Sequence, residues 1–247
     1  MRYLVLTDIH ANLEALDACL ADATTRRYGA SVVLGDLVGY GADPNVVIER
    51  IQALAPVAIV RGNHDKVACG LEQAEGFNAV AKSAVYWTLD TLTPANRSWL
   101  ANLPEGPTTV DDVVEICHGS PFDEDAYIFD ELDAVRALKA STRPLCLFGH
   151  THYPAAFELA DGTVDSLGRS TAPEAHLPLR DGAKYLVNPG SVGQPRDGDP
   201  RAAYAIVDTD AMDVELIRLE YPIARAQSKV MKAGLPEMLA QRLSVGR

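Results

Sequence analysis

The chain has 247 residues, of which 47% are hydrophobic and 23% are charged, a composition typical of a soluble globular enzyme with a substantial core. Its net charge of −12 opposes stable binding to nucleic acid, which requires clustered Lys and Arg. No segment contains the roughly 20 apolar residues that cross a bilayer, and the N-terminal apolar run is too short for a signal peptide. The four cysteines show no C-x-x-C spacing, which fits a reducing compartment. We therefore expect a cytoplasmic protein that does not associate with membranes.

The first half of the chain alternates short apolar runs with amphipathic segments. The segment with Leu13, Leu16 and Leu20 on one face predicts a helix, and a second helix is expected after Asp43-Pro44, a capping residue followed by proline. The apolar runs predict strands buried on both faces, as in a largely parallel sheet covered by helices. These runs are residues 3–6, 32–34, 57–60, 113–116 and 145–148.

The second half of the chain has a different pattern. Asp161-Gly162, between two apolar runs, predicts a hairpin, and further strands are expected at 185–187, 203–207 and 214–219. Helical patterns fill residues 68–106, interpreted as an insertion between the third and fourth strands, and residues 222–247, a C-terminal helical tail. Two stacked mixed β-sheets flanked by helices, a four-layer α/β/β/α sandwich, would use all these elements. Without a linker or repeat, we expect residues 1–247 to form a single domain.

Each early strand ends at a short polar motif, and these motifs contain five of the six histidines. Taken singly, such a motif is more often a turn or a structural histidine, since Asn and Asp favour turns. Their recurrence at strand ends argues for a shared site, because the carboxyl ends of strands in α/β sheets gather catalytic residues. Clustered imidazoles and carboxylates suit two divalent metal ions and the hydrolysis of phosphate esters. The motifs are Asp8-Ile9-His10, Gly35-Asp36, Gly62-Asn63-His64-Asp65, His118-Gly119-Ser120 and Gly149-His150-Thr151-His152.

Two spacings suggest how the ligands meet. Asp8 and His10 lie two residues apart, as do His150 and His152, and in extended backbone such pairs project to the same side. Asp36 follows a glycine that permits a tight turn, and its two carboxylate oxygens suit a bridge between two ions.

The order D-x-H, G-D, G-N-H-D, H, G-H-x-H resembles that of the calcineurin-like metallophosphoesterases, with the spacing of their small prokaryotic phosphodiesterase branch. The match spans Asp8 to His152, and Asn188 to Arg196 is similar to that branch's closing segment, so that the resemblance covers about residues 1–208. It implies one metal bound by Asp8, His10, Asp36 and His152 and a second bound by Asp36, Asn63, His118 and His150, with Asp36 bridging.

The resemblance also implies a mechanism. Two divalent transition metal ions would activate a hydroxide for in-line attack on phosphorus, with manganese expected first and iron, nickel, cobalt or zinc as alternatives. His64 would face the substrate and protonate the leaving oxygen, the alternative being a turn histidine that bonds to backbone.

Two further residues have alternative roles. Asp65 either orients His64 or serves a local turn. Arg196 either clamps a substrate phosphate or forms a surface ion pair, and His176 is expected in a surface loop.

One difference from a related branch argues against a protein phosphatase. Phosphoprotein phosphatases carry G-D-x-x-D-R-G, whereas this chain has Gly39 and Tyr40 in place of the Asp-Arg pair. We expect a phosphodiesterase acting on a small phosphoester or nucleotide-like substrate. Alternatives are a phosphomonoesterase or protein phosphatase, a dinucleoside polyphosphate hydrolase, and a non-catalytic metal-binding scaffold like the retromer subunit that resembles this branch. That subunit has lost the histidine equivalent to His64, which this chain retains. The sequence carries no signal for oligomeric state.

Overall fold

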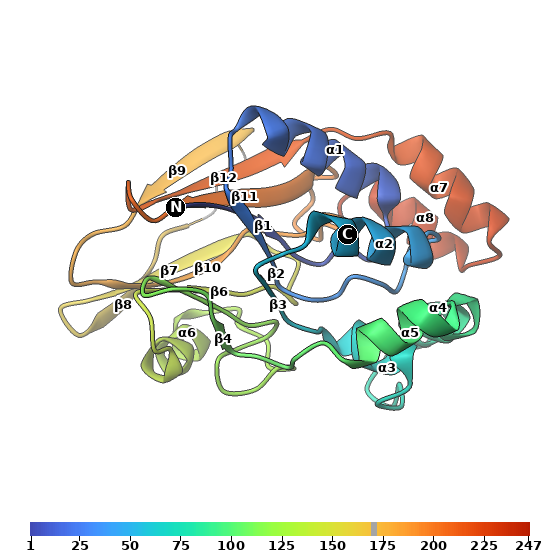
Figure 1. Ribbon diagram of the computed structural model, residues 1–247, viewed down its shortest axis with the longest axis horizontal. Coiled ribbons are helices and arrows are strands. Elements are labelled where there is room, and N and C mark those ends of the chain that lie inside the picture. Colours follow the sequence, from blue (N-terminus) through green and yellow to red (C-terminus); the bar gives the residue numbers. More distant parts are fainter. Residues whose placement is uncertain (169–171) are drawn as a thin grey trace.

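The computed structural model describes residues 1–168 and 172–247 and contains two stacked β-sheets (Figure 1). The first sheet has the strand order β3-β2-β1-β11-β12-β9 and the second the order β4-β5-β6-β10-β7-β8. The first is built from β1 (Arg2–Leu6), β2 (Ala30–Val33), β3 (Ala58–Ile59), β9 (Glu174–Pro178), β11 (Ala202–Asp208) and β12 (Asp213–Leu219). The second is built from β4 (Thr108–Thr109), β5 (Val114–Ile116), β6 (Leu145–Leu147), β7 (Ala155–Ala160), β8 (Thr163–Ser166) and β10 (Lys184–Asn188).

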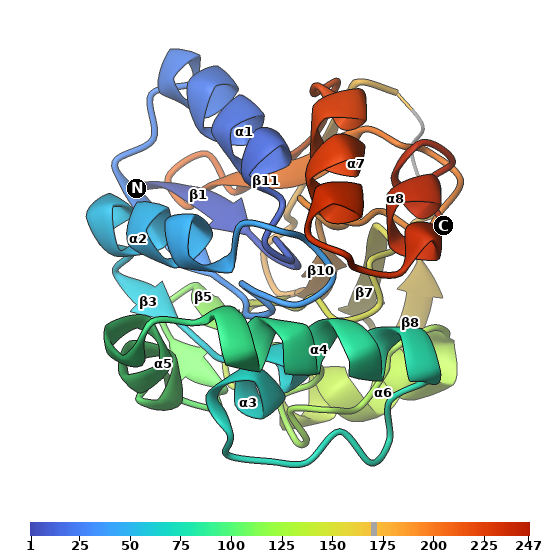
Figure 2. The ribbon, with the colours of Figure 1, turned by 90° about the vertical axis from the view of Figure 1, so that its right-hand side faces the viewer.

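Helices cover the outer faces of both sheets and confirm the predicted four-layer α/β/β/α sandwich. On the first sheet lie α1 (Leu13–Thr25) and α2 (Pro44–Leu54), and on the second lies α6 (Glu131–Ala140). The other helices gather at one end of the molecule (Figures 1 and 2). They are α3 (Asn63–Cys69), α4 (Ala79–Thr91), α5 (Pro94–Ala101), α7 (Ile223–Lys232) and α8 (Glu237–Leu243). No helix in the described part of the chain is long and apolar enough to span a bilayer.

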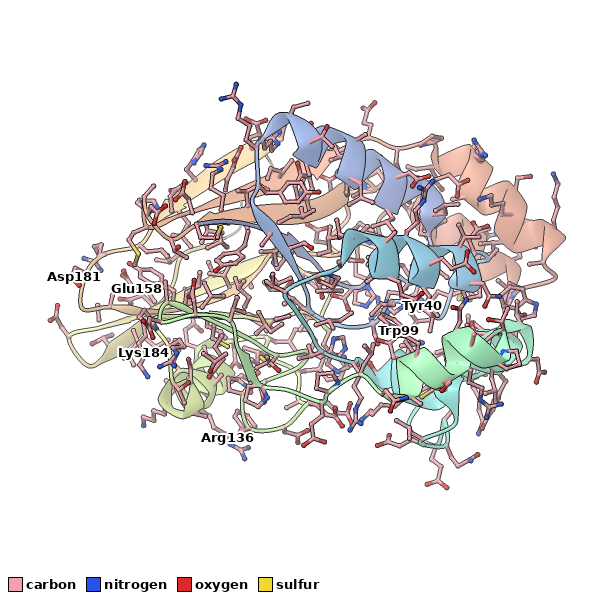
Figure 3. The ribbon with its side chains drawn as sticks, viewed as in Figure 1. Tyr40, Trp99, Arg136, Glu158, Asp181 and Lys184 are labelled. Atoms are coloured by element: carbon pink, nitrogen blue, oxygen red, sulfur yellow. The ribbon has the colours of Figure 1, made fainter. Side chains whose placement is uncertain are left out.

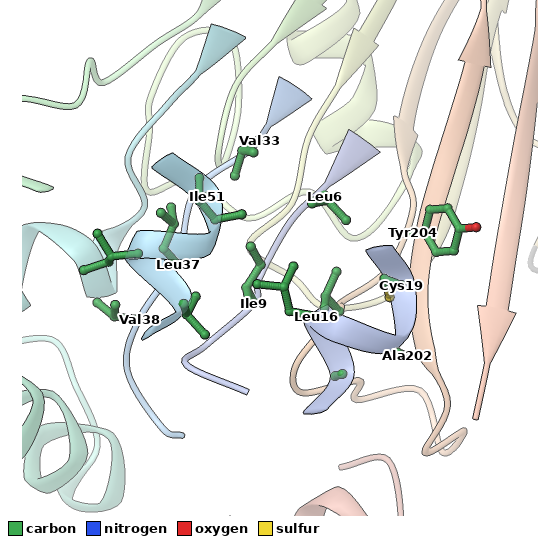
Figure 4. Packing of buried hydrophobic residues seen from close by; sticks show 14 of the residues in the cluster. Leu6, Ile9, Leu16, Cys19, Val33, Leu37, Val38, Ile51, Ala202 and Tyr204 are labelled. Atoms are coloured by element: carbon green, nitrogen blue, oxygen red, sulfur yellow. The ribbon is translucent and has the colours of Figure 1, made fainter. Parts of the chain in front are cut away.

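The apolar runs are continuous because both faces of their strands are buried. Val5 and Val32 point between the sheets, where they meet Ile116 and Leu147 of the second sheet. Leu6, on the opposite face of β1, packs in the cluster that contains residues of α1 and α2 (Figure 4). Burial of alternate side chains in two different cores therefore fixes the register of the central strands.

The central strands run parallel, and this places the loops that follow them at one end of the molecule. In the first sheet β1 pairs parallel with β2 and β2 with β3; in the second, β6 pairs parallel with β5 and β10. Parallel strands end at the same edge of a sheet. Tyr40 lies towards this end, whereas Glu158 and Asp181 lie at the opposite end (Figure 3).

His176 lies in a strand, so its predicted loop position was wrong. β9 pairs antiparallel with β12 at the edge of the first sheet. The neighbouring prolines Pro173 and Pro178 indicated a loop, but an edge strand accepts proline because its outward N–H needs no partner. The His176 side chain is exposed, as expected, and its Nδ1 lies 2.7 Å from Asp213 Oδ2.

If contact between the sheets stabilises the fold, Leu147→Ala should lower the free energy of unfolding by about 2–5 kcal/mol, because it leaves a cavity in the core between them. Urea denaturation followed by circular dichroism measures this change. Val57→Ala, at a side chain that is 62% exposed, is the control and should change stability by less than about 0.5 kcal/mol. A similar small change for Leu147→Ala would contradict the packing described.

Candidate metal centre

The structure brings all seven predicted metal ligands together at the ends of the parallel strands. Asn63 is partly exposed, and the six other side chains are buried. Two groups of donors, each with all its atoms within 4.8 Å of one another, share Asp36. The first group is Asp8, His10, Asp36 and His152, and the second is Asp36, His118 and His150. Asn63 extends the second group, because its Oδ1 lies 3.4 Å from His118 Nε2.

Left-handed backbone, rather than the predicted extended backbone, positions most of these ligands. The φ angles are 50° at Asp8, 49° at His10, 52° at Asp36, 66° at His150 and 60° at His152. Asp and His are among the residues that tolerate this region, which is uncommon for side chains in general. The prediction from two-residue spacing was therefore wrong about the backbone, although it paired the correct residues. Such strain persists where surrounding contacts hold it, and here Asp8 N and His10 N donate to the carbonyls of Gly35 and Asp36 at 3.1 and 2.9 Å.

Each ligand histidine has one ring nitrogen against a backbone carbonyl. A carbonyl oxygen only accepts hydrogen bonds, so that nitrogen carries the proton and the other nitrogen of the neutral ring presents a lone pair. The contacts are His10 Nδ1 to Val38 O at 3.0 Å, His118 Nδ1 to Leu34 O at 2.8 Å, His152 Nδ1 to Gln194 O at 2.7 Å and His150 Nε2 to Asp125 O at 3.1 Å. Carbonyl contacts of this kind orient metal-binding imidazoles.

The opposite ring nitrogens face one another in pairs. His10 Nε2 lies 3.0 Å from His152 Nε2, and His118 Nε2 lies 3.1 Å from His150 Nδ1. Asp36 Oδ2 lies 3.5 Å from both His10 Nε2 and His118 Nε2. Facing lone pairs in a buried site repel unless a proton or a metal ion lies between them, and so these donors fit divalent cations with Asp36 between the two groups.

Burial controls the charges of the ligands in the absence of metal. It lowers the pKa of His10 and His152 well below the usual value and that of His150 to about 3, so that these rings are neutral. Burial opposes the charged form of His118 as well, but the adjacent Asp36 carboxylate outweighs it and raises the pKa of His118 to about 10. A proton on His118 thus partly compensates the buried charge of Asp36.

A buried lysine supports the loop behind His150. Lys66 is 2% exposed, and its Nζ lies 2.6 Å from Asp125 Oδ2 and 3.1 Å from Glu124 Oε1. The backbone carbonyl of Asp125 is the partner of His150 Nε2. Lys66 therefore fixes the loop whose carbonyl orients His150, a candidate metal ligand.

His64 lies beside the metal ligands, in an aromatic environment. Its ring centroid is 4.3 Å from that of Tyr40, 4.6 Å from Phe77 and 4.9 Å from His10. Burial lowers the pKa of His64 to about 4, and its Nδ1 is buried without a hydrogen-bond partner in the described part of the chain. A Cβ at Gly39 would lie 2.4 Å from this nitrogen, so the space where phosphatases place an Asp is closed to a side chain.

Asp65 serves its local backbone and does not orient His64. Its Oδ2 accepts from Gly62 N at 3.0 Å and its Oδ1 from Val38 N at 3.2 Å. The first contact caps the N-terminus of α3, and the second ties that helix to the loop after β2. The structure therefore agrees with the predicted role of Asp65 in a local turn and not with the predicted role of orienting His64.

An open cavity of about 120 Å³ adjoins the donors. Arg196 lines it, and its Nη2 donates to Tyr40 Oη at 3.1 Å and Gln194 Oε1 at 3.2 Å. Within residues 1–168 and 172–247, no carboxylate pairs with Arg196, so the predicted surface ion pair is absent there. The residues that line the cavity include Tyr40, Asn63, His64, Tyr127, Arg196 and Arg242.

Several residues at the site carry no signal in the sequence. Tyr127 stacks on His150 with ring centroids 4.0 Å apart, but no motif surrounds it. Asp125 and Gln194 act through backbone carbonyls, which any residue supplies. Tyr40 carries one signal, its position close to Asp36 in the sequence, and its ring centroid lies 4.6 Å from that of His10.

Residues 1–212 match the calcineurin-like phosphoesterase superfamily domain. An uncharacterized protein of Methanocaldococcus jannaschii is 36% identical over 253 residues, covering 98% of this chain and 97% of its own. The crystal structure of a metallophosphoesterase from Sphaerobacter thermophilus is 39% identical, with a TM-score of 0.87 over 100% of this chain and 99% of its own. A hypothetical protein of Pyrococcus horikoshii shares the fold at 21% identity, with a TM-score of 0.81 over 100% and 98% of the two chains.

Asp36→Asn should reduce metal binding at both groups, because it removes the negative charge shared between them. Inductively coupled plasma mass spectrometry after dialysis against Mn²⁺ should give about two ions per wild-type chain and less than one per variant chain. Asp43→Asn, which removes an equal charge from a carboxylate paired with Lys229, is the control and should retain the wild-type content. Unchanged metal content in Asp36→Asn would refute the bridging position.

Proposed function

The chain belongs to the calcineurin-like phosphoesterase superfamily, whose members are metal-dependent phosphoester hydrolases, and on this premise we propose that it is a phosphodiesterase acting on small or nucleotide-like substrates. The observation that carries the proposal is the pair of donor groups sharing Asp36 beside an open cavity. Two metal sites next to an open cavity suit phosphoryl chemistry.

We assign the proposed ligands to two metal ions in the way that the family resemblance implies. Divalent ions at these positions would polarise the phosphoryl group and lower the pKa of bound water. Imidazole, carboxylate and amide donors without a thiolate suit manganese, the metal proposed here, and also accept iron, nickel, cobalt or zinc. The first ion would be held by Asp8, His10, Asp36 and His152, and the second by Asp36, Asn63, His118 and His150.

Two further residues have proposed roles toward the substrate. Arg196, which lines the cavity with no carboxylate partner in the described ranges, would hold a phosphoryl oxygen through its planar fork. His64 would donate to the leaving oxygen, which is costly to expel as an alkoxide. Burial favours the neutral ring of His64, and an anionic substrate in the cavity would counteract this by favouring the protonated form.

The residues at positions 39 and 40 favour a diester over a monoester or a phosphoprotein. A phosphomonoester carries more negative charge than a diester, and phosphoprotein phosphatases meet it with the arginine of their G-D-x-x-D-R-G motif. Here Tyr40 takes that position and packs on His64, while Gly39 leaves no room for an Asp to support the ring. A dinucleoside polyphosphate hydrolase would use the same centre and is the second candidate.

Turnover of bis(p-nitrophenyl) phosphate and p-nitrophenyl phosphate by protein loaded in turn with Mn, Fe, Co, Ni and Zn tests the proposal. The expected result is a higher kcat/KM for the diester, because Tyr40 replaces the phosphatase arginine. A higher value for the monoester would overturn the diester assignment. Full metal occupancy without hydrolysis of either ester or of a dinucleoside polyphosphate would identify a scaffold instead.

His64→Ala should lower kcat by about 10²–10⁴ with retained metal content, because the leaving oxygen loses its donor. The loss should shrink as the leaving group becomes more acidic, which is measured with a series of aryl diesters. His176→Ala, which removes an exposed histidine far along the first sheet, is the matched control and should leave kcat unchanged. Equal losses for good and poor leaving groups would assign His64 a structural role.

A further inference from the structure

A second arginine, Arg242, lines the same cavity as His64 and Arg196. It is carried by α8, in the C-terminal tail, far in sequence from every metal ligand. Arg242 and Arg196 together also line an adjoining hollow with Tyr153 and Asp197. The two guanidinium groups therefore lie along one path that begins at the metal centre.

The tail that carries Arg242 is fixed against the site. Leu239 and Ala240 are buried in a cluster with Tyr40 and with Ala81 and Ala84 of α4. Beyond the helix, the carbonyl of Gly246 accepts a hydrogen bond of 2.8 Å from Gly198 N, two residues after Arg196. This packing holds Arg242 beside the segment of Arg196, and so their proximity is a property of the fold.

Neither Arg196 nor Arg242 forms an ion pair in the described ranges, although acidic residues outnumber basic ones by 34 to 22 in the whole chain. Asp197, a carboxylate that lines the adjoining hollow with them, is paired with Arg218. Two other partly buried arginines have carboxylate partners: Arg26 pairs with Asp22 and Arg61 with Glu124. Burial and the like charge of Arg196 lower the pKa of Arg242, as expected for a cation without a counter-ion.

We propose that Arg242, together with Arg196, forms an anion subsite that binds a second phosphate of the substrate, next to the phosphate at the metal centre. The inference rests on the proposed function, which places the reacting phosphate at that centre. Guanidinium groups match phosphate oxygens through paired hydrogen bonds, and a bound phosphate would relieve the repulsion between the two arginines. The ligand class is a nucleotide derivative with two phosphates, joined by an anhydride or attached to both sides of a ribose.

Tyr127 supports the nucleotide character of this ligand. It lines the same cavity, is 48% exposed, and its ring stacks with those of His150 and Phe129, whose centroids lie 4.0 and 5.4 Å away. Phe129 is itself 54% exposed, and exposed aromatic rings are the surfaces on which nucleic-acid bases stack.

Isothermal titration of AMP, ADP and adenosine 3′,5′-bisphosphate into metal-loaded protein tests the subsite. Wild type should bind at least one of the two-phosphate ligands about tenfold more tightly than AMP, or better, because a charge-assisted contact is added. Arg242→Gln should remove the tighter binding of two-phosphate ligands. Arg242→Lys keeps the positive charge but loses the parallel N–H donors of the guanidinium, and so it should retain part of the tighter binding. Arg225→Gln, at an exposed arginine on α7 that pairs with Glu14, is the matched control and should retain it all.

Equal affinity of wild type for all three ligands, or an undiminished gain in Arg242→Gln, would overturn the subsite. The binding assay separates this outcome from failure of the proposed function. Protein that does not hydrolyse any ester but binds the second phosphate through Arg242 retains the subsite without the activity. Protein that hydrolyses bis(p-nitrophenyl) phosphate but gains nothing from a second phosphate retains the activity without the subsite.

Discussion

The structure depends on one electrostatic constraint: two pairs of buried imidazoles bring ring nitrogens to 3.0 and 3.1 Å from each other beside the Asp36 carboxylate. Such an arrangement is unfavourable in a dry protein interior unless positive charge lies between the donors. With metal absent, a proton on His118 supplies part of that charge, since Asp36 raises the pKa of this histidine to about 10. A pair of divalent ions would supply it in full, and the family to which the chain belongs uses divalent metals.

The fold meets this constraint by bringing the carboxyl ends of two parallel strand sets together from separate sheets. The core between the sheets sets their distance, and left-handed loops then turn Asp8, His10 and Asp36 inward. Hydrogen bonds between the loops after β1 and β2 maintain these strained conformations. Helices α3, α4, α7 and α8 surround the same end (Figure 2), and of these α8 contributes Arg242 to the cavity next to the centre.

The fold class and the membership of the site could be predicted from the sequence because both are encoded locally. Apolar runs specify strands buried on both faces, and the ligand motifs directly follow those runs. Contacts between distant segments could not be predicted in this way. The carbonyl of Gln194 orients His152, and although the closing segment that contains Gln194 resembles the family, nothing in its sequence indicates this contact. Helix α8, which has no motif, brings Arg242 to the cavity that Arg196 lines. The expected extended backbone was wrong for a related reason, since spacing alone does not report the tertiary hydrogen bonds that stabilise left-handed residues.

Anomalous X-ray diffraction at the manganese absorption edge, from crystals grown with Mn²⁺, tests the central claim most directly. The account predicts two peaks on opposite sides of Asp36: one within reach of Asp8, His10 and His152, and the other within reach of Asn63, His118 and His150. A single peak, or a peak confined to the separate acidic group of Glu72, Glu124 and Asp125, would contradict it.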